Sequence, residues 1–133
     1  MRKVEKKEIE DLDKMFKTKR NVVELDPLFF QYLEFEENIY YGEYTSSHKN
    51  GLGRMEDVIN QFVDDSEFDL KELSTCFVMI ETPEGSGLLM EEINTFFKKL
   101  TDNFNSEAIT TWSYALNNDI ANGECNLIVV VTK

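Results

Sequence analysis

The segment CFVMIETPEGSGLLMEEINTFFKKL, residues 76–100, constrains the fold of this chain more than any other. It starts with β-branched and aromatic residues, passes through two glycines, and ends in apolar residues at helical spacing. This order predicts a strand over 74–82, a tight turn, and a helix from Leu88. A strand that leads through glycines into a helix is typical of phosphate-binding proteins. The turn is therefore the first candidate site.

The turn lacks the residues that hold phosphate. A Walker loop places Lys and then Ser or Thr directly after its last glycine, whereas Gly85 and Gly87 are followed by Leu88. Acidic residues also surround the expected helix start: Glu84, Glu91 and Glu92. Carboxylates stabilise a helix N-terminus, and they repel phosphate from the same place. We expect a structural turn that holds no nucleotide, with Ser86 or a neighbouring group capping the helix.

Two helices are expected in the first 37 residues. The apolar residues of the first segment recur at helical spacing, as Ile9, Leu12, Met15 and Phe16. Asp26-Pro27 has the pattern of a helix cap followed by proline at the first helical position. A short helix after it is expected to bury one face, formed by Leu28, Phe29, Tyr32 and Leu33.

The rest of the chain predicts an α/β two-layer sandwich. Strands are expected over 38–46, 74–82, 108–116 and 125–132, with helices over 52–64 and from Leu88. Asn122-Gly123 favours a hairpin between the last two strands. The order β-α-β-α-β-β predicts a mixed four-stranded sheet with helices on one face, preceded by one or two N-terminal helices. We divide the chain into a helical extension, 1–37, and an α/β domain, 38–133.

The charge is acidic and unevenly spread. The formal net charge is −12, from 14 Lys and Arg against 26 Asp and Glu. Residues 1–20 carry 8 basic and 5 acidic residues, or +3, which leaves −15 for the remainder. Nucleic acid binding needs clustered Lys and Arg, so we expect none. The basic start is expected to dock on an acidic partner or on the acidic body of the chain itself.

Membrane insertion and export are not expected. No run approaches the roughly 18 apolar residues of a membrane span, and the first residues lack the apolar stretch of a signal peptide. These features predict a cytoplasmic protein without a membrane partner.

The chemically reactive residues give no recognisable active site. Cys76 and Cys125 lie in apolar runs and are expected to be buried, reduced thiols in neighbouring strands. The single histidine, His48, lies in a polar turn and is expected at the surface, so a Cys/His zinc site lacks ligands. The acidic segment 64–72 resembles a calcium loop only faintly, because it lacks the required glycine and terminal Glu.

Arg54 and Trp112 are the remaining candidates. Arg54 opens a helix after a glycine-containing turn, and we expect it to pair with Glu56, Asp57 or a neighbouring acidic loop. Trp112 is expected in the core, with an interface as the alternative. Three arginines are few for a pocket that grips an anionic metabolite. We assign no catalytic, cofactor-binding or metal-binding residue, and we expect no cofactor.

Residues 38–132 resemble the C-terminal domain of the FtsZ/tubulin family. The segment YYGEYTSSHKNGLGRMEDVINQF is similar to the family's strand, glycine-bearing turn and helix. The segment DLKELSTCFVMIETPEGSGLLMEEINTFFKKL resembles its acidic linker, strand, glycine turn and helix, and WSYALNNDIANGECNLIVVVTK its final two strands. The resemblance covers about seven tenths of the chain, in order.

The resemblance implies the fold without the GTPase. The family binds GTP through a GGGTG[ST]G loop in a separate N-terminal domain, and this chain contains no such loop. The family's acidic loop before this domain corresponds to NVVELDPLFF, where Pro27 and Leu28 break the pattern. We therefore place no catalytic role on Glu24 or Asp26.

These features predict a non-catalytic protein-interaction module related to the cytoskeletal polymers of cell division. Its partner is expected to be a tubulin-like GTPase or a second copy of the chain. The alternative is a small-molecule-binding or enzymatic α/β domain whose site lies at a subunit interface. A cleft that contains Arg54, His48 and a carboxylate would favour this alternative.

Overall fold

The computed structural model describes residues 1–24, 28–47 and 53–133. Its strands are β1 (Arg2–Val4), β2 (Arg20–Val23), β3 (Ile39–Thr45), β4 (Thr75–Thr82), β5 (Ile109–Leu116) and β6 (Asn126–Thr132). Its α-helices are α1 (Ile9–Lys17), α2 (Phe29–Leu33), α3 (Arg54–Asp65) and α4 (Met90–Asp102). Short 3-10 helices cover Lys6–Glu8, Leu70–Glu72 and Glu84–Ser86.

The described strands form one six-stranded sheet in the order β1-β3-β6-β4-β5-β2. Only β4 and β5 are parallel, and α4 makes the crossover between them. The other neighbouring strands are antiparallel. The mixed sheet therefore has β6 and β4 at its centre, between edges formed by the short strands β1 and β2.

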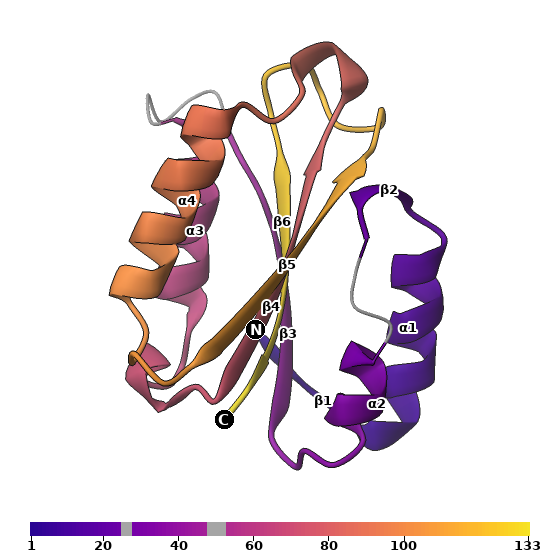
Figure 1. Ribbon diagram of the computed structural model, residues 1–133, viewed down its shortest axis with the longest axis vertical. Helices are drawn as coiled ribbons and strands as arrows, with labels where there is room; N and C mark the ends of the chain where they lie inside the picture. The colour runs from indigo at the N-terminus through magenta and orange to yellow at the C-terminus, as the bar shows by residue number, and fades with distance from the viewer. Residues whose placement is uncertain (25–27, 48–52) are drawn as a thin grey trace.

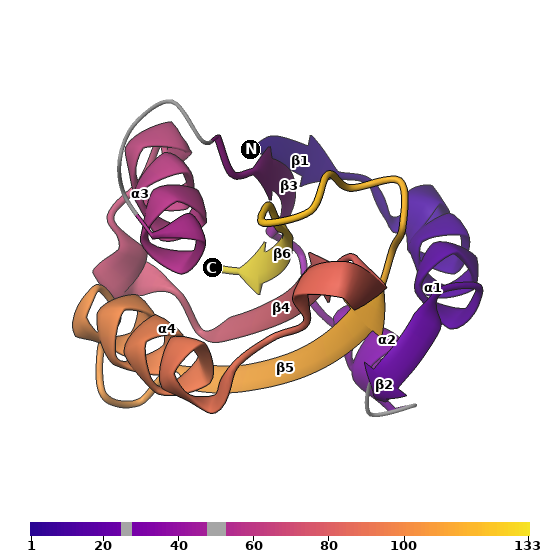
Figure 2. The ribbon, with the colours of Figure 1, turned by 90° about the horizontal axis from the view of Figure 1, so that it is seen from above.

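Helices cover both faces of this sheet, as Figures 1 and 2 show. Every residue of β4 is buried, which is the pattern of a strand covered on two sides. Alternate residues of β4 enter different cores. Val78 and Ile80 pack with α3 and α4, and Phe77 and Met79 pack with α1 and α2. The molecule is a three-layered α/β structure.

The α/β class is confirmed, but the predicted strand count and layers are wrong. The sheet has six strands in place of four, because 2–4 and 20–23 form β1 and β2. Runs of three or four residues are too short to show the alternation that identifies a strand. The helices occupy two faces because α1 buries its apolar stripe on the sheet through Ile9, Leu12 and Phe16.

The predicted hairpin between the last two strands is also wrong. β5 and β6 are not neighbours, because β4 lies between them and pairs with both. Gly123 nevertheless makes a turn before β6, with φ of 84°. A turn signal such as Asn122-Gly123 marks a reversal of the chain, and it does not identify the strands that pair.

The N-terminal segment is part of the same sheet as the remainder. β1 pairs with β3 through Arg2↔Tyr41, and β2 pairs with β5 through Arg20↔Leu116. The basic start of the chain, residues 1–20, thus packs on the chain's own body, which is one of the two positions predicted for it. The division at residue 37 remains a prediction.

Candidate functional site

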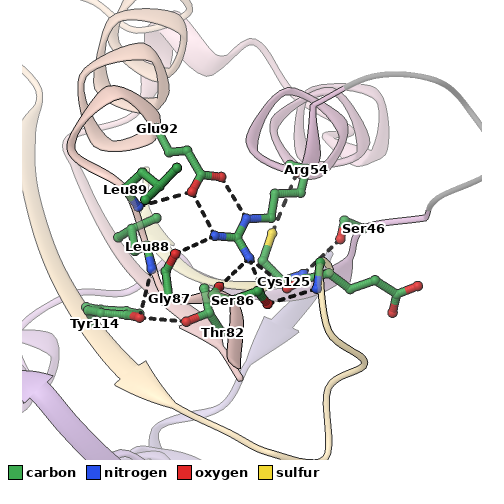
Figure 3. Close-up of polar contacts among 12 residues, drawn as sticks. Ser46, Arg54, Thr82, Ser86, Gly87, Leu88, Leu89, Glu92, Tyr114 and Cys125 are labelled. Carbon is green, nitrogen blue, oxygen red and sulfur yellow. Dashed lines mark hydrogen bonds and ion pairs between the residues drawn. The ribbon is translucent and has the colours of Figure 1, made fainter. Parts of the chain in front are cut away.

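Figure 3 shows a network of polar contacts around the glycine turn between β4 and α4. It follows the carboxyl end of β4, beside the end of the parallel strand β5. Ligand sites of α/β sheets commonly lie outside the carboxyl ends of parallel strands. The position therefore makes the turn a candidate site on topology as well as on sequence.

Arg54, the first residue of α3, holds this turn in place. Its Nη1 donates to the carbonyl oxygens of Ser86 at 2.7 Å and Glu124 at 3.2 Å. Its Nη2 donates to the carbonyl oxygen of Gly87 at 2.9 Å. Its Nε and Nη2 each donate to one carboxylate oxygen of Glu92, both at 2.7 Å. The five N–H donors of a guanidinium are thereby engaged, so Arg54 has none left for an anionic ligand.

Two backbone amides directly before α4 are engaged as well. Leu88 N donates to the hydroxyl of Tyr114 at 3.1 Å, and that hydroxyl lies 2.6 Å from Oγ1 of Thr82. Leu89 N donates to Oε1 of Glu92 at 3.1 Å. Phosphate-binding turns present such amides to the ligand. In this turn they are bound within the chain.

The turn is also tied to the loop that precedes β6. Gly123 N donates to Oγ of Ser86 at 2.8 Å. Cys125 and Ser46 exchange two hydrogen bonds, N to O at 2.9 Å and N to Oγ at 2.8 Å. The thiol of Cys125 lies 3.6 Å from the carbonyl oxygen of Arg54. Three loops and the first turn of α3 therefore form one connected unit.

The electrostatics of this unit favour ionised Glu92 beside charged Arg54. Burial raises the pKa of Glu92, but hydrogen bonds from Arg54 and Leu89 and the charge of Arg54 outweigh it, so the pKa lies below its ordinary 4.5. The hydrogen bonds to Glu92 likewise raise the pKa of Arg54. The pair stays charged at neutral pH and links the starts of α3 and α4.

Two large apolar side chains next to this rigid turn face solvent. Leu89 is 63% exposed and Met90 is 72% exposed. The predicted start of this helix at Leu88 is two residues early, because Leu89 precedes α4 with an extended backbone (ψ 150°). Beside the turn lies a hollow of about 230 Å³, lined by Gly53, Arg54, Met55, Glu56, Glu91, Glu92 and Thr95. The arrangement presents apolar contact area with an acidic rim.

The partner of Arg54 differs from the two residues named in the prediction. It is Glu92, 38 positions away, whereas Glu56 pairs with Lys99 at 2.5 Å. The capping group of α4 is also Glu92, and Ser86 binds the loop at Gly123 instead. An acidic residue three positions into a helix is a known capping signal, and it was the available clue to Glu92.

The other candidates occupy ordinary structural positions. Cys76 in β4 and Cys125 before β6 are free and buried. Trp112 is half-buried and stacks edge-on against Phe97, with ring centroids 5.5 Å apart. His48 and Asp26 lie outside the described residues.

Metal and membrane sites find no support in the described chain. Among residues 1–24, 28–47 and 53–133, no cluster of His, Cys, Asp and Glu is arranged to hold a metal ion, the segment 64–72 included. In the same residues, no helix has both the length and the hydropathy to cross a bilayer.

The fold is similar to that of FtsZ. The sequence matches no protein-family profile and no curated protein. The empty FtsZ dimer of M. jannaschii superposes over 89% of this chain and 34% of its own, with a TM-score of 0.68 and 14% identity. A mutant FtsZ of M. jannaschii matches 71% of this chain and 27% of its own, with a TM-score of 0.55 and 14% identity.

The chain therefore spans about a third of the length of the FtsZ structures it resembles. At this level of identity the likeness concerns the fold. The resemblance to the FtsZ C-terminal domain noted in the sequence is confirmed at that level.

Proposed function

We propose that this chain is a non-catalytic module that binds a protein partner through the turn between β4 and α4. The observation that carries the proposal is the contrast at this turn. Two of its carbonyl oxygens and two of its amides are bound within the chain, by Arg54, Tyr114 and Glu92. Its apolar side chains, Leu89 and Met90, are exposed. Exposed apolar groups on a rigid support are typical of protein contacts, because little conformational entropy is lost when they are buried.

The proposed partner is a tubulin-like GTPase in the cytoplasm. The chain has the fold of one part of FtsZ, at about a third of its length. A module of this kind can occupy a contact surface between subunits of a polymer without contributing GTP hydrolysis. It would then cap the polymer or compete for its longitudinal surface.

Self-association is the second candidate for the same surface. The FtsZ structure that the chain resembles is described as a dimer. The net charge of −12 opposes association of two copies. We therefore favour a different protein as the partner.

The small-molecule alternative has less support. The hollow beside the turn does contain Arg54 and carboxylates. All five donors of Arg54 are committed to acceptors within the chain. An anionic ligand would have to displace Glu92, at the cost of a partly buried ion pair.

The proposal is tested by capture of partners from a lysate of the source cell, followed by binding and GTPase assays with the purified partner. The test variant is Leu89→Asp/Met90→Asp. Its control is Asn60→Asp/Ser106→Asp, which adds the same charge at two exposed positions away from the turn. We expect the wild type and the control to capture a tubulin-like GTPase and to change its rate, and the test variant to do neither.

Two results would overturn the proposal. One is that no tubulin-like GTPase is captured by the wild type. The other is that the Leu89→Asp/Met90→Asp variant captures it as well as the wild type does. Deletion of residues 1–20 is unsuitable as a test, because β1 and α1 belong to the sheet and its core.

A further inference from the structure

A second apolar surface lies on α2, on the face of the sheet opposite to α4. We define the α2 surface by four residues with exposed fractions of 62% for Leu28, 45% for Tyr32, 83% for Phe35 and 62% for Ile109. Leu28, Tyr32 and Phe35 follow the spacing i, i+4, i+7 and so share one side of the helix. Helical hydrogen bonds continue along them, from Tyr32 N to Leu28 O at 3.0 Å and from Phe35 N to Tyr32 O at 3.1 Å.

The exposed side of α2 is additional to a buried side. α2 already buries Phe29, Phe30 and Leu33 in the core. Its outer side therefore adds apolar area that the fold itself does not use. Beside it, α2 and the sheet enclose a hollow of about 230 Å³, lined by Leu28, Phe29, Tyr32, Thr75, Cys76, Ile109 and Thr111. This volume accommodates a large apolar side chain, and such a hollow is where an anchor residue of a partner binds.

The two segments that carry the α2 surface are acidic, although Lys6 lies next to the first of them and donates from Nζ to the carbonyl oxygen of Glu34 at 3.0 Å. Residues 28–37 contain three acidic residues, Glu34, Glu36 and Glu37, and no Lys or Arg. Residues 105–113 contain Glu107 and no Lys or Arg. The carboxylate of Glu36 accepts a hydrogen bond from Tyr32 and thereby raises the pKa of that phenol. A partner that covers this surface is favoured if its own flanks are basic.

The fold restricts the partner further. A second copy would bring the same carboxylates opposite one another, which is unfavourable. The basic segment of the chain itself, residues 1–20, is not available either, because the apolar stripe of α1 within it is already packed on the sheet. Strand addition is disfavoured, because both edge strands are short and basic, with Arg2 and Lys3 in β1 and Arg20 in β2.

We propose that the α2 surface binds a basic amphipathic helix of another protein. Leu28, Tyr32 and Phe35 form an apolar row along α2, against which the apolar face of a partner helix can pack. One anchor enters the hollow beside Ile109, and Lys or Arg on the flanks of the partner helix faces Glu34, Glu36 and Glu107. This surface is separate from the turn that presents Leu89 and Met90, so the module can bridge two partners.

The test uses a labelled designed peptide of about 18 residues, long enough for several helical turns, with Leu on one face and Lys on the flanks. Its counterpart carries Glu in place of every Lys. Fluorescence anisotropy measures both with the wild type, with Phe35→Ser/Ile109→Ser, and with Leu89→Ser/Met90→Ser. Phe35→Ser/Ile109→Ser leaves the net charge at −12, so a general attraction between acidic protein and basic peptide remains unchanged. All four substituted side chains are exposed, which keeps folding intact.

We expect the Lys peptide to bind the wild type and Leu89→Ser/Met90→Ser with similar affinity. Phe35→Ser/Ile109→Ser should weaken it by about tenfold or more, and added salt should weaken the wild-type complex. Equal binding to Phe35→Ser/Ile109→Ser, or equal binding of the Glu peptide, would overturn the proposal. Self-association of the wild type in sedimentation that Phe35→Ser/Ile109→Ser abolishes would also overturn it, because the surface would then hold a second copy. The two proposals can fail independently, because the proposed function is tested with variants of Leu89 and Met90 and the α2 surface with variants of Phe35 and Ile109.

Discussion

The guanidinium of Arg54 and the carboxylate of Glu92 form a bidentate ion pair, with both N–O distances at 2.7 Å. The pair connects the first residue of α3 with the first turn of α4. The two side chains are 11% and 20% exposed, so water screens the pair far less than a surface pair. Because the same guanidinium also binds carbonyl oxygens of the glycine turn, the conformation beside Leu89 and Met90 depends on it.

Arg54→Met is expected to reduce the free energy of unfolding by about 2–4 kcal/mol, because it leaves Glu92 and three carbonyl oxygens without their donor. Urea unfolding followed by the fluorescence of Trp112, the single tryptophan, measures the loss. Lys17→Met is the matched control. It breaks an exposed pair with Asp13, Nζ to Oδ2 3.0 Å, and should cost less than about 0.5 kcal/mol. Similar losses for the two variants would contradict the anchoring role of Arg54.

The ion pair also predicts a dependence of stability on pH. The folded pKa of Glu92 lies below 4.5, so the unfolded chain binds the proton more readily. The stabilisation is complete above 4.5 and is lost as the pH falls through the lower, folded pKa. Unfolding free energies of the wild type and Glu92→Gln, measured from neutral pH into the acid range, isolate this contribution. Their difference should shrink on acidification, and a constant difference would refute the assignment.

Gly123 is expected to tolerate substitution less well than Gly85. The φ of Gly123 is 84°, a conformation in which a side chain costs about 1–2 kcal/mol. A Cβ on Gly85 would meet only the amide end of Asn122, at 2.7 Å to Oδ1, and that exposed side chain can move. Thermal unfolding of Gly123→Ala and Gly85→Ala compares them. A larger loss of thermal stability for Gly85→Ala than for Gly123→Ala would contradict this prediction.

The long elements of the fold could be predicted from the sequence because each has a sustained period. The strand expected over 74–82 is β4, Thr75–Thr82, and the helix expected over 52–64 is α3, Arg54–Asp65. Such periods report which face of an element is buried. They do not report the order of strands in a sheet, so β4 between β5 and β6 was not foreseen.

The same limit applies to α2 and to the candidate site. The predicted single apolar face of α2 is wrong, because Phe29 and Leu33 are buried whereas Leu28 and Tyr32 are exposed. A helix that is apolar on two sides gives the same composition whichever side faces the core. The pairing of Arg54 with Glu92 depends on the packing of α3 against α4, which no local pattern specifies. The surface that we propose for protein contacts could therefore not be located from the sequence.

Neither thiol is expected to react in the folded protein. Burial raises the pKa of Cys125 to about 12 and raises the pKa of Cys76 as well, so the reactive thiolate is scarce. Titration with a thiol reagent at mildly alkaline pH should detect no fast-reacting cysteine in native protein and both cysteines in urea. Rapid labelling of Cys125 in the native state would show that the site around Arg54 opens, because this thiol lies 3.6 Å from the carbonyl oxygen of Arg54.

The central claim, a partner-binding turn on an FtsZ-type fold, is tested most directly by sedimentation of the tubulin-like GTPase polymer of the same cell. Added wild-type chain is expected to lower the amount of pelleted polymer or to pellet with it. The variant Leu89→Asp/Met90→Asp is expected to do neither. It should unfold at the same urea concentration as the wild type, because both residues are exposed. Polymer that pellets unchanged, with the wild-type chain left in the supernatant, would contradict the claim.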